Sequence, residues 1–488
     1  PWHQPQAAAV RRVARMDFGR LRGVWRRVFA LAWPVMAEQI TRTSMRTVDV
    51  LVTVAISPAA VVAVGLADLF ARFPLRIGLG LGGGAIALAS QDTGSGAAGT
   101  RDESVVQSLL LGVLAGVPFV VLGLLAGPTL VGVFPASDDA VRLGGTYLAV
   151  VLATAPARHV ALVGSRTLQG IGDTTTPMYV NTFVNVVNAG LSIGLGFGLA
   201  GLPTLGVVGV AAATATANTL SAGLLVAAIY RPSSPLAPVR PADPTIGVQL
   251  IRVGSPRAAE GFVSELAAFP FNALLLSLGP ATGVTAAGAS PGDVVNAGYQ
   301  VSRRVYQQVT APLSRGYNVA ASVLVGQALG RSDPETARDE GWATAALALV
   351  SVGGVGLLLI GFANPVVAAL GVGRSPAALE FAAQFAVAYG LSAPGLALFV
   401  SLSGALQGAG ATRIPFLARL TGMVGFFVGF SYVAVTYTDL GLIGVYAGVV
   451  LAHVWMGATM LVAFRDADWA GTAAGLLRER GSLPADDG

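Results

Sequence analysis

Cysteine and lysine are both absent from this sequence of 488 residues, and charged residues of all kinds make up only 11% of it. Without cysteine there can be no disulfide, no thiolate metal site and no cysteine nucleophile. The scarcity of charge argues against a soluble domain, because soluble chains carry roughly 25% charged residues. With 54% hydrophobic residues and a mean hydropathy of +0.68, the chain is expected to be a membrane protein.

The basic excess points to lipid rather than to nucleic acid. The formal net charge is +5, and arginine supplies all of the Lys and Arg total. Most of these arginines stand at the edges of apolar runs, where they suit anionic headgroups and help to orient a membrane protein. We therefore expect contacts with membrane lipids and none with nucleic acid.

Twelve transmembrane helices are predicted, since each span needs roughly 20 apolar residues. The first, second, seventh and eighth spans carry several charges, and hydropathy alone rates them poorly. The predicted spans are 28–54, 62–90, 104–133, 141–168, 177–200, 204–230, 252–279, 294–327, 340–370, 379–406, 414–437 and 440–464.

An internal repeat supports the weakly apolar spans. The segment LQGIGDTTTP at 168–177 returns as LQGAGATRIP at 406–415, and a second similar pair lies at 90–94 and 326–330. The second half therefore has six spans because the first half has six. Both copies point the same way, so we expect an all-α fold of two pseudo-symmetric six-helix bundles, related by an axis along the membrane normal. A change in the repeat offset indicates an insertion of about 14 residues within 281–295.

Five regions are predicted along the chain. Arginine is more frequent in the loops on the side of both chain ends, so the positive-inside rule puts both termini in the cytoplasm of a multi-pass cell-membrane protein. No cleavable signal peptide is expected, because the first apolar segment is long and charged. The regions are a basic N-terminal tail (1–27), an N-terminal six-helix lobe (28–230), a cytoplasmic linker (231–247), a C-terminal six-helix lobe (248–465) and a cytoplasmic tail (466–488).

Several ionisable residues fall inside the predicted first span. Glu38, Arg42, Arg46 and Asp49 follow one another at spacings of four, four and three, so they share one helical face. An ionisable group at membrane depth costs at least about 2.5–3.5 kcal/mol, which makes each one a functional candidate. Glu38 and the arginines can equally form ion pairs that only hold the bundle together. Asp49 lies deeper, and we expect it to have a functional role.

Other spans carry charge as well. Asp68 and Arg72 continue the charged pattern on the second span, and Glu265 on the seventh could line a cavity. Glu260, nearer the cytoplasmic end, is expected to pair with an arginine of its own helix. Arginines beside carboxylates can have either of two roles. They neutralise the carboxylates and lower their pKa values, or they bind an anionic substrate. Both interpretations stay open.

Enzyme motifs are weak in this chain. The matches to GxGxxG and GxSxG lack the strand-turn-helix context that these motifs need. His159 and His453 stand alone on apolar helices and are expected to be packed, neutral side chains rather than metal ligands. The HExxH, Walker and EF-hand patterns are absent, which argues against ATP-driven transport within this chain.

An ordered set of motifs resembles the multidrug and toxic compound extrusion (MATE) family of antiporters. The resemblance covers about residues 30–465, and its strength lies in the order of the motifs on the twofold repeat. The motifs are Trp33-Pro34, Val48-Asp49, AVGL at 63–66, the 168–177 segment, Asn185 to Asn188, GVVG at 206–209 leading to Thr214, VGQ at 325–327, DPE at 333–335 and QGAG at 407–410.

The resemblance implies two six-helix bundles that form a V-shaped cavity and work by alternating access. It implies exchange of H⁺ or Na⁺ for amphipathic organic substrates, with Pro34 as a hinge. The family's cation site matches Asp49, Asn188 and Thr214, while Ser192 stands where many members carry a second Asp. The missing carboxylate leaves open whether Asp49 binds Na⁺ with neutral oxygens or takes up a proton.

The resemblance also suggests which residues line the substrate cavity or form its charge network. The family's acidic residue on the seventh span has its nearest match in Glu265. The candidate residues are Glu38, Arg42, Arg46, Asp68, Arg72, Asn185 and Glu265.

Two rival functions remain. A related flippase or exporter of anionic lipid-linked substrates would use the intramembrane arginines, whereas an intramembrane enzyme would need a nucleophile such as Ser192. For the antiporter we expect no catalytic residue, no cofactor beyond the coupling ion, no metal beyond Na⁺ at Asp49, a small-molecule substrate and a monomer. The substrate, the coupling ion and the resting state are not predicted.

Overall fold

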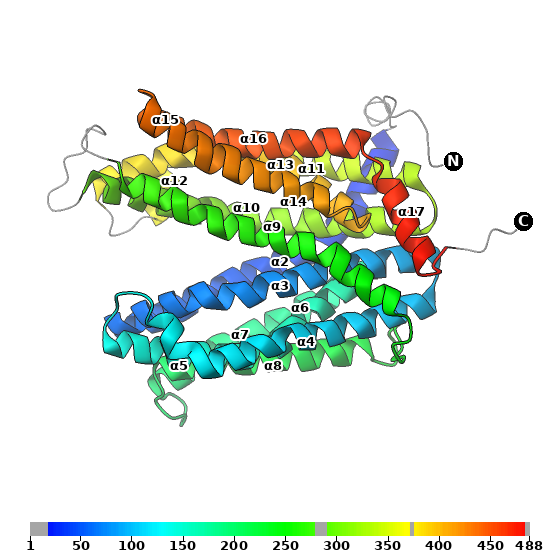
Figure 1. The fold of residues 1–488 in the computed structure, drawn as a ribbon, viewed down its shortest axis with the longest axis horizontal. Coiled ribbons are helices and arrows are strands. Elements are labelled where there is room, and N and C mark those ends of the chain that lie inside the picture. The colour runs from blue at the N-terminus through cyan, green and yellow to red at the C-terminus, as the bar shows by residue number, and fades with distance from the viewer. Residues whose placement is uncertain (1–17, 279–289, 371–374, 484–488) are drawn as a thin grey trace, which may run out of the picture. The chain divides into compact units, whose positions relative to one another are not determined.

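The computed structural model describes residues 18–278, 290–370 and 375–483, and within these ranges the regular structure is entirely helical. Most of the predicted insertion at 281–295, and the start of the predicted N-terminal tail, lie outside the described residues. The remaining predictions of spans can be compared with the helices directly (Figure 1).

From residue 18 on, the first half of the chain contains seven described helices, two of which belong to one span. They are α2 (Phe18–Ile56), α3 (Pro58–Ser95), α4 (Ala98–Val131), α5 (Asp138–Ala153), α6 (Ala155–Gly170), α7 (Thr175–Phe197) and α8 (Val207–Ile229). The second half begins with α9 inside the predicted linker. Its helices are α9 (Pro244–Leu276), α10 (Pro291–Gly330), α11 (Pro334–Gly361), α12 (Ala363–Leu370), α13 (Pro376–Gly408), α14 (Arg413–Thr421), the π-helix η2 (Gly422–Phe430), α15 (Ser431–Tyr437), α16 (Gly441–Asp466) and α17 (Trp469–Glu479).

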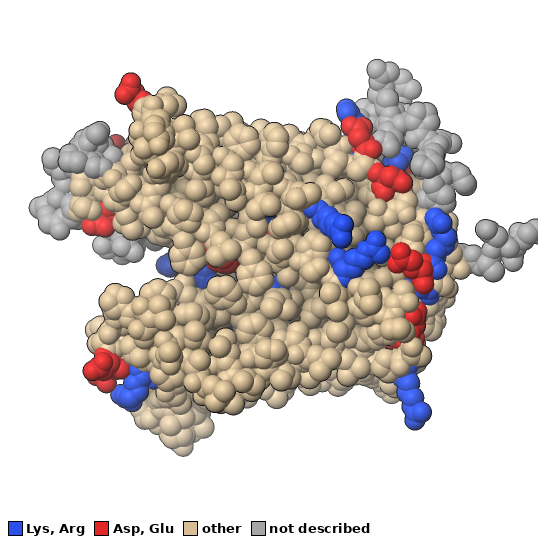
Figure 2. Space-filling model, viewed as in Figure 1, with Lys and Arg blue, Asp and Glu red and all other residues tan. Residues whose placement is uncertain are grey.

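The helices have the length and composition of membrane spans. Nine described helices are individually long and apolar enough to cross a membrane, and α5 with α6 adds a tenth as a bent pair. The long helices α2 and α10 fall short of this test, and they correspond to the charged first and eighth predicted spans. In Figure 2 the flank over α4 is almost free of charge, and charged side chains gather near helix ends. The protein is therefore an all-helical, multi-pass membrane protein, as predicted.

Three predicted spans are less regular than expected. The fourth breaks after Ala153 and bends by 50°, where Pro156 occupies the first turn of α6 and cannot donate a backbone hydrogen bond. The ninth is interrupted at Phe362, between α11 and α12. The eleventh contains the nine-residue π-helix η2, a rare conformation that is frequent at functional sites.

The chain forms two compact units. Unit 1 comprises Pro1–Ala32, Ala259–Val325 and Asp333–Ala473, and unit 2 comprises Trp33–Ala258, Gly326–Ser332 and Ala474–Gly488. The helices α2, α9, α10 and α17 each contribute residues to both units. In α2 the boundary falls directly before Trp33, and the helix runs through Pro34 without a break.

Small residues allow helices to approach closely in each unit. In unit 1, a Cβ added at Gly395 of α13 would collide with the backbone of His453 in α16. In unit 2, one added at Gly116 of α4 would collide with the backbone of Pro156 in α6. Contacts of this kind drive helix association in lipid, where burial of apolar surface gives no net advantage.

The C-terminal segment of unit 2 is folded into its core. Arg480, just beyond α17, donates through Nε to Asp92 Oδ1 at 2.8 Å, through Nη1 to Gln249 at 3.0 Å and through Nη2 to Gln91 at 2.9 Å. The side chains of Arg480 and Asp92 are both 0% exposed. The predicted tail at 466–488 therefore includes a helix and the arginine of a fully buried ion pair.

Candidate functional site

A row of polar contacts joins α2 to α7 within unit 2. The partners are separated along the chain by 143 or 144 residues at each step, so the two helices run parallel and in constant register. We call this row the polar ladder. Its pairs are Glu38–Asn181, Thr41–Asn185, Met45–Asn188 and Asp49–Ser192.

The polar ladder ends in the predicted cation site. Ser192 donates its hydroxyl to Asp49 Oδ1 at 2.8 Å and lies 3.4 Å from Asn188 Oδ1. Ser192 and Asn188 are buried, whereas Asp49 is only half-buried. Among the described residues, no arginine lies within ion-pairing distance of Asp49. The oxygens of Ser192 and Asn188 thus lie together beside a carboxylate that has no arginine partner among the described residues.

Thr214 of α8 is not hydrogen-bonded to this group. Its hydroxyl donates to the backbone oxygen of Val210 at 3.1 Å, one turn earlier on the same helix. The described contacts therefore bring together Asp49, Asn188 and Ser192, and leave Thr214 on the neighbouring helix without a direct contact to them.

Asn181 organises the other end of the polar ladder, and the sequence analysis did not identify it. Its amide donates to Glu38 Oε1 at 3.1 Å and to Ser165 at 3.2 Å, and its oxygen accepts from Ser221 at 2.9 Å. Glu38 also pairs with Arg42 at 2.9 Å, as the ion-pair interpretation predicted. Asn181 and its three partners are all buried, so this network joins α2, α6, α7 and α8.

A second group of charges lies along α2 and α3 in unit 2. Arg46, Asp68 and Arg72 are exposed, and Arg46 interacts electrostatically with both of the others. Neither Arg46 nor Asp68 forms an ion pair with a described residue. Arg158 of α6 also interacts with Arg46 and Asp68, and donates to the backbone oxygen of Ala71 at 3.3 Å. An exposed charge at membrane depth must face water or protein rather than lipid.

The acidic residues of the seventh span lie in unit 1. Glu260 pairs with Arg419 of α14 at 2.9 Å and is 2% exposed. The predicted pairing of Glu260 with an arginine of its own helix stays a prediction. Arg419 also donates to Ser264 at 3.2 Å. Glu265 is half-buried on α9 and belongs to a different unit from Asp49.

His159 and His453 occupy packed positions. The ring nitrogens of His159 lie 3.2 Å from the backbone oxygen of Gly112 and 2.7 Å from that of Pro74, and the side chain is 0% exposed. His453 contacts the backbone oxygen of Val449 at 2.8 Å. In the part of the chain that the structure describes, no group of three or more His, Cys, Asp or Glu could hold a metal ion.

Comparison with protein families gives the identity of this fold. A family model described as MatE matches residues 34–193 and 271–433, which is well over half of the chain. The chain belongs to the MatE family. Each matched range contains one copy of the repeated segment, 168–177 or 406–415, and the first range contains every residue of the polar ladder.

Curated MatE relatives match this chain over most of its length. The probable multidrug resistance protein NorM of Rhodopseudomonas palustris is 29% identical over 91% of this chain and 93% of its own. The protein of the same name from Thermotoga maritima is 27% identical over 76% of this chain and 77% of its own.

Solved structures share the MatE fold. A MOP superfamily transporter from Pyrococcus furiosus aligns with a TM-score of 0.81 at 20% identity, over 97% of this chain and 99% of that one. A MATE protein in complex with MaL6 aligns with a TM-score of 0.81 at 22% identity, over 93% of this chain and 97% of that one. At these identities the likeness concerns the fold alone. This MatE chain is a membrane transporter by family.

Proposed function

We propose that this protein is a secondary active exporter that exchanges H⁺ or Na⁺ for amphipathic organic substrates by alternating access. The relatives from Rhodopseudomonas palustris and Thermotoga maritima carry the name multidrug resistance protein, which supports multidrug efflux as the class of activity. The single observation that supports the coupling site most strongly is the environment of Asp49. Its carboxylate accepts from Ser192, lies beside buried Asn188 and has no ion pair among the described residues.

Such a carboxylate can exchange a small cation with water. A carboxylate clamped by arginine would already be neutralised, and a new cation would have to displace the guanidinium. Asp49 is instead half-buried and held by one neutral hydroxyl. Hard cations accept neutral oxygen ligands, so the oxygens of Asn188 and Ser192 could complete a Na⁺ site. Protonation of Asp49 would serve the same purpose without these ligands.

Coupling follows if the ion and the substrate favour opposite conformations. A ligand shifts an equilibrium only by its differential affinity for the two states, and the coupling free energy is the same in both directions. In this proposal, cation binding at Asp49 favours one conformation of α2, with Pro34 as the hinge, while Thr214 contributes from α8. The substrate then favours the conformation from which the cation has left. Arg46, Asp68 and Arg72, which are exposed at predicted membrane depth, would line the aqueous path of unit 2 together with Arg42 and Asn185. Glu265 of unit 1 stays a separate candidate, and Glu38 would anchor the buried end of the polar ladder.

The proposal also covers topology and assembly. Both termini and the linker at 231–247 would lie in the cytoplasm, and the lobes 28–230 and 248–465 would be the functional halves of a monomer in the cell membrane. Cysteine scanning is direct here because the sequence contains no cysteine. Thiol labelling of the Ser233→Cys variant only after the membrane is made permeable would support this topology.

Efflux under separately imposed gradients tests the proposal. Purified protein would be reconstituted in liposomes with a fluorescent amphipathic cation such as ethidium, and a Na⁺ gradient or a pH gradient would be applied alone. We expect one of the two gradients to drive dye transport, and we expect that transport to stop when the gradient is collapsed. Movement of the dye that ignores both gradients would contradict antiport.

A second function is favoured by the arginines of unit 2. Arg46 carries no ion pair among the described residues, and Arg158 and Arg42 lie in its electrostatic surroundings. The report on the transporter from Pyrococcus furiosus states that a reversed polarity of its binding pocket suggests a different function for that protein. For the present chain, export of an anionic lipid-linked substrate would require a guanidinium such as that of Arg46. Binding of a fluorescent anionic amphiphile that weakens in Arg46→Gln, with no effect of either cation gradient, would favour this function.

A further inference from the structure

A three-residue motif occurs once in each half of the chain, where the third and ninth predicted spans begin. Arg101-Asp102-Glu103 lies in the first turns of α4, and Arg338-Asp339-Glu340 lies in the first turns of α11. The two copies are 237 residues apart, whereas the repeated segments that begin at 90 and at 168 return after 236 and 238 residues. The motif therefore occupies the same position in both copies of the internal repeat.

In unit 2 the glutamate of this motif holds the start of α9. Glu103 Oε1 accepts hydrogen bonds from the backbone nitrogens of Ala242 and Asp243, the two residues that precede α9. Gln107, one turn later on α4, donates to the backbone oxygen of Asp243 at 2.7 Å. The N–H groups at the start of a helix have no acceptor within that helix, and Glu103 supplies one from α4.

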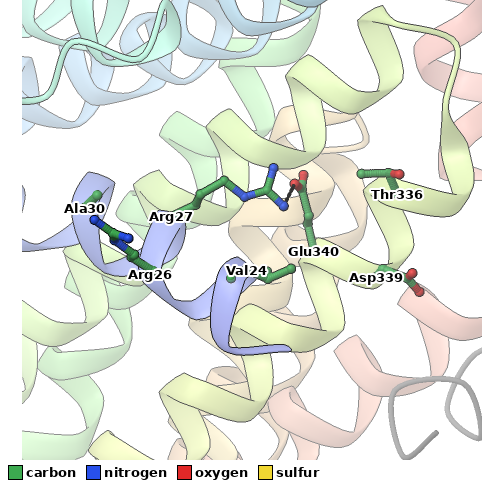
Figure 3. Close-up of a pocket in the computed structure, with 8 residues that line it drawn as sticks. Val24, Arg26, Arg27, Ala30, Thr336, Asp339 and Glu340 are labelled. Carbon is green, nitrogen blue, oxygen red and sulfur yellow. Dashed lines mark ion pairs between the residues drawn. The ribbon is translucent and has the colours of Figure 1, made fainter. Parts of the chain in front are cut away.

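In unit 1 the glutamate of the second copy holds the start of α2. Figure 3 shows Arg27 reaching Glu340, with a distance of 3.0 Å between Nη2 and Oε1. The Glu340 side chain is only 1% exposed, so its charge is compensated inside unit 1. Three residues later on α11, the backbone oxygen of Ala343 accepts from the indole nitrogen of Trp25 at 3.0 Å. The repeated glutamate thus binds the start of a half's first helix in both units.

Each of these first helices begins in the unit that contains most of the other half. Ala32 ends the part of α2 that belongs to unit 1, and Ala258 ends the part of α9 that belongs to unit 2. Both divisions lie beside a second repeated motif, since PVMAE at 34–38 returns as PRAAE at 256–260. Proline removes a backbone hydrogen bond from a helix and favours bending there. The helices α2 and α9 therefore combine a bound start with a position where bending is easy.

We infer that Glu103 and Glu340 are matched anchors for the conformational change. The helices α2 and α9 bend beside Pro34 and Pro256, while their starts stay bound to the two glutamates. A charge-assisted hydrogen bond is about twice as strong as a neutral one, and a buried carboxylate that loses its partner is left uncompensated. Bending at a proline breaks no such bond. The inference rests on the proposed alternating access, in which the two glutamates are positioning residues.

Hydrogen exchange of the full-length protein, measured by mass spectrometry, tests the anchors without transport. Glu340→Gln removes the charge but keeps the size, and it should raise the exchange rate at the start of α2 by about fivefold, with no change at the start of α9. Glu103→Gln should give the reverse pattern. Asp139→Asn, which removes an exposed ion pair with Arg142, is the matched control and should change neither start. A rise at both starts in one anchor variant, or at neither, would overturn the inference.

A covalent link in place of each anchor tests whether the helix starts stay fixed during transport. The chain has no cysteine, so a short bis-maleimide joins only the pair of cysteines that is introduced. Two pairs would be made, Arg27→Cys with Glu340→Cys and Ala242→Cys with Glu103→Cys. Each pair should slow ethidium efflux in proteoliposomes by about tenfold, because a charge-assisted bond is lost. The bis-maleimide should restore most of the lost rate, whereas N-ethylmaleimide, which modifies the same cysteines without joining them, should not.

The outcomes separate this inference from the proposed function. Efflux that stops on cross-linking would mean that the helix starts have to move, and it would overturn the inference. Efflux at the wild-type rate before cross-linking would overturn it as well. If the wild-type protein shows no gradient-driven efflux, the proposed function fails, and the exchange rates of the two glutamine variants still decide whether Glu103 and Glu340 anchor the helices.

Discussion

Ser192 donates its hydroxyl to the carboxylate of Asp49 at 2.8 Å, and this bond joins α7 to α2 inside unit 2. It belongs to a row of four contacts in one register, in which every partner on α7 stands 143 or 144 residues after its partner on α2. The two helices are parallel and in contact at four positions. A change in the protonation or cation binding of Asp49 is therefore expected to alter the packing of α2 against α7. The proposed mechanism depends on that connection.

Replacement of Ser192 by Asp should strengthen Na⁺ binding. The second carboxylate would stand beside Asp49, and a unit charge about 4 Å from a bound cation contributes several kcal/mol at an effective dielectric constant near 20. We expect the half-saturating Na⁺ concentration for transport to fall by about tenfold or more. The readout is Na⁺-dependent dye transport in proteoliposomes.

Ser192→Asn is the matched control for this change, because it alters size and hydrogen bonding without adding charge. The expected result is a clear difference in Na⁺ dependence between the Asp and Asn variants. Identical Na⁺ responses in the two variants would argue that no cation binds near Ser192.

Asn181 should be needed for stability more than for coupling. Asn181→Leu would keep the volume but remove the bonds to Glu38, Ser165 and Ser221, and leave buried polar groups unsatisfied. Each such group costs about 1–3 kcal/mol. We expect a lower apparent Tm in detergent, measured by fluorescence-detected size-exclusion after heating.

Asn185→Leu provides the comparison for Asn181. Asn185 is half-buried on the same helix and makes a single long contact, 3.5 Å, to Thr41. Its replacement should lower the apparent Tm by much less. If the two variants lost the same amount of apparent Tm, the hydrogen bonds of Asn181 would stabilise the protein no more than the single contact of Asn185 does.

Arg480 should be required for stable folding, because it neutralises the buried carboxylate of Asp92. Arg480→Gln would leave Asp92 as a buried, uncompensated carboxylate, and breaking a buried pair in this way costs about 3–5 kcal/mol. We expect a large loss of folded protein after extraction. Asp92→Asn combined with Arg480→Gln should recover part of that loss, since no charge then remains unpaired. A double variant that is worse than the single one would contradict the ion-pair explanation.

The sequence predicted the fold better than its irregularities. Hydropathy alone rates the charged spans poorly, but the repeat predicted them, because LQGIGDTTTP at 168–177 returns as LQGAGATRIP at 406–415. The helices α2 and α10 occupy two of these spans. The break after Ala153 had a visible signal in Pro156, because proline interrupts backbone hydrogen bonding. The π-helix at Gly422–Phe430 had none, since its composition is that of any apolar span.

The candidate site was predictable where the motifs covered it. Asp49, Asn188 and Ser192 follow from the resemblance, and the structure brings their side chains together. Asn181 lies on the same face of α7 as Asn185, four residues earlier, which is a signal that spacing could have supplied. The bond between Arg480 and Asp92 joins residues 388 positions apart, and no local pattern indicates such a partner.

The central claim is that the Asp49 carboxylate carries the coupling ion. Asp49→Asn keeps the size of the side chain and can still contact Ser192, but it can neither take up a proton nor hold a cation by charge. Dye efflux driven by an imposed Na⁺ or pH gradient should be compared for the wild-type and Asp49→Asn proteins, reconstituted at equal amounts and with equal elution profiles. The account predicts that gradient-driven efflux disappears in the variant, and efflux at the wild-type rate would contradict it.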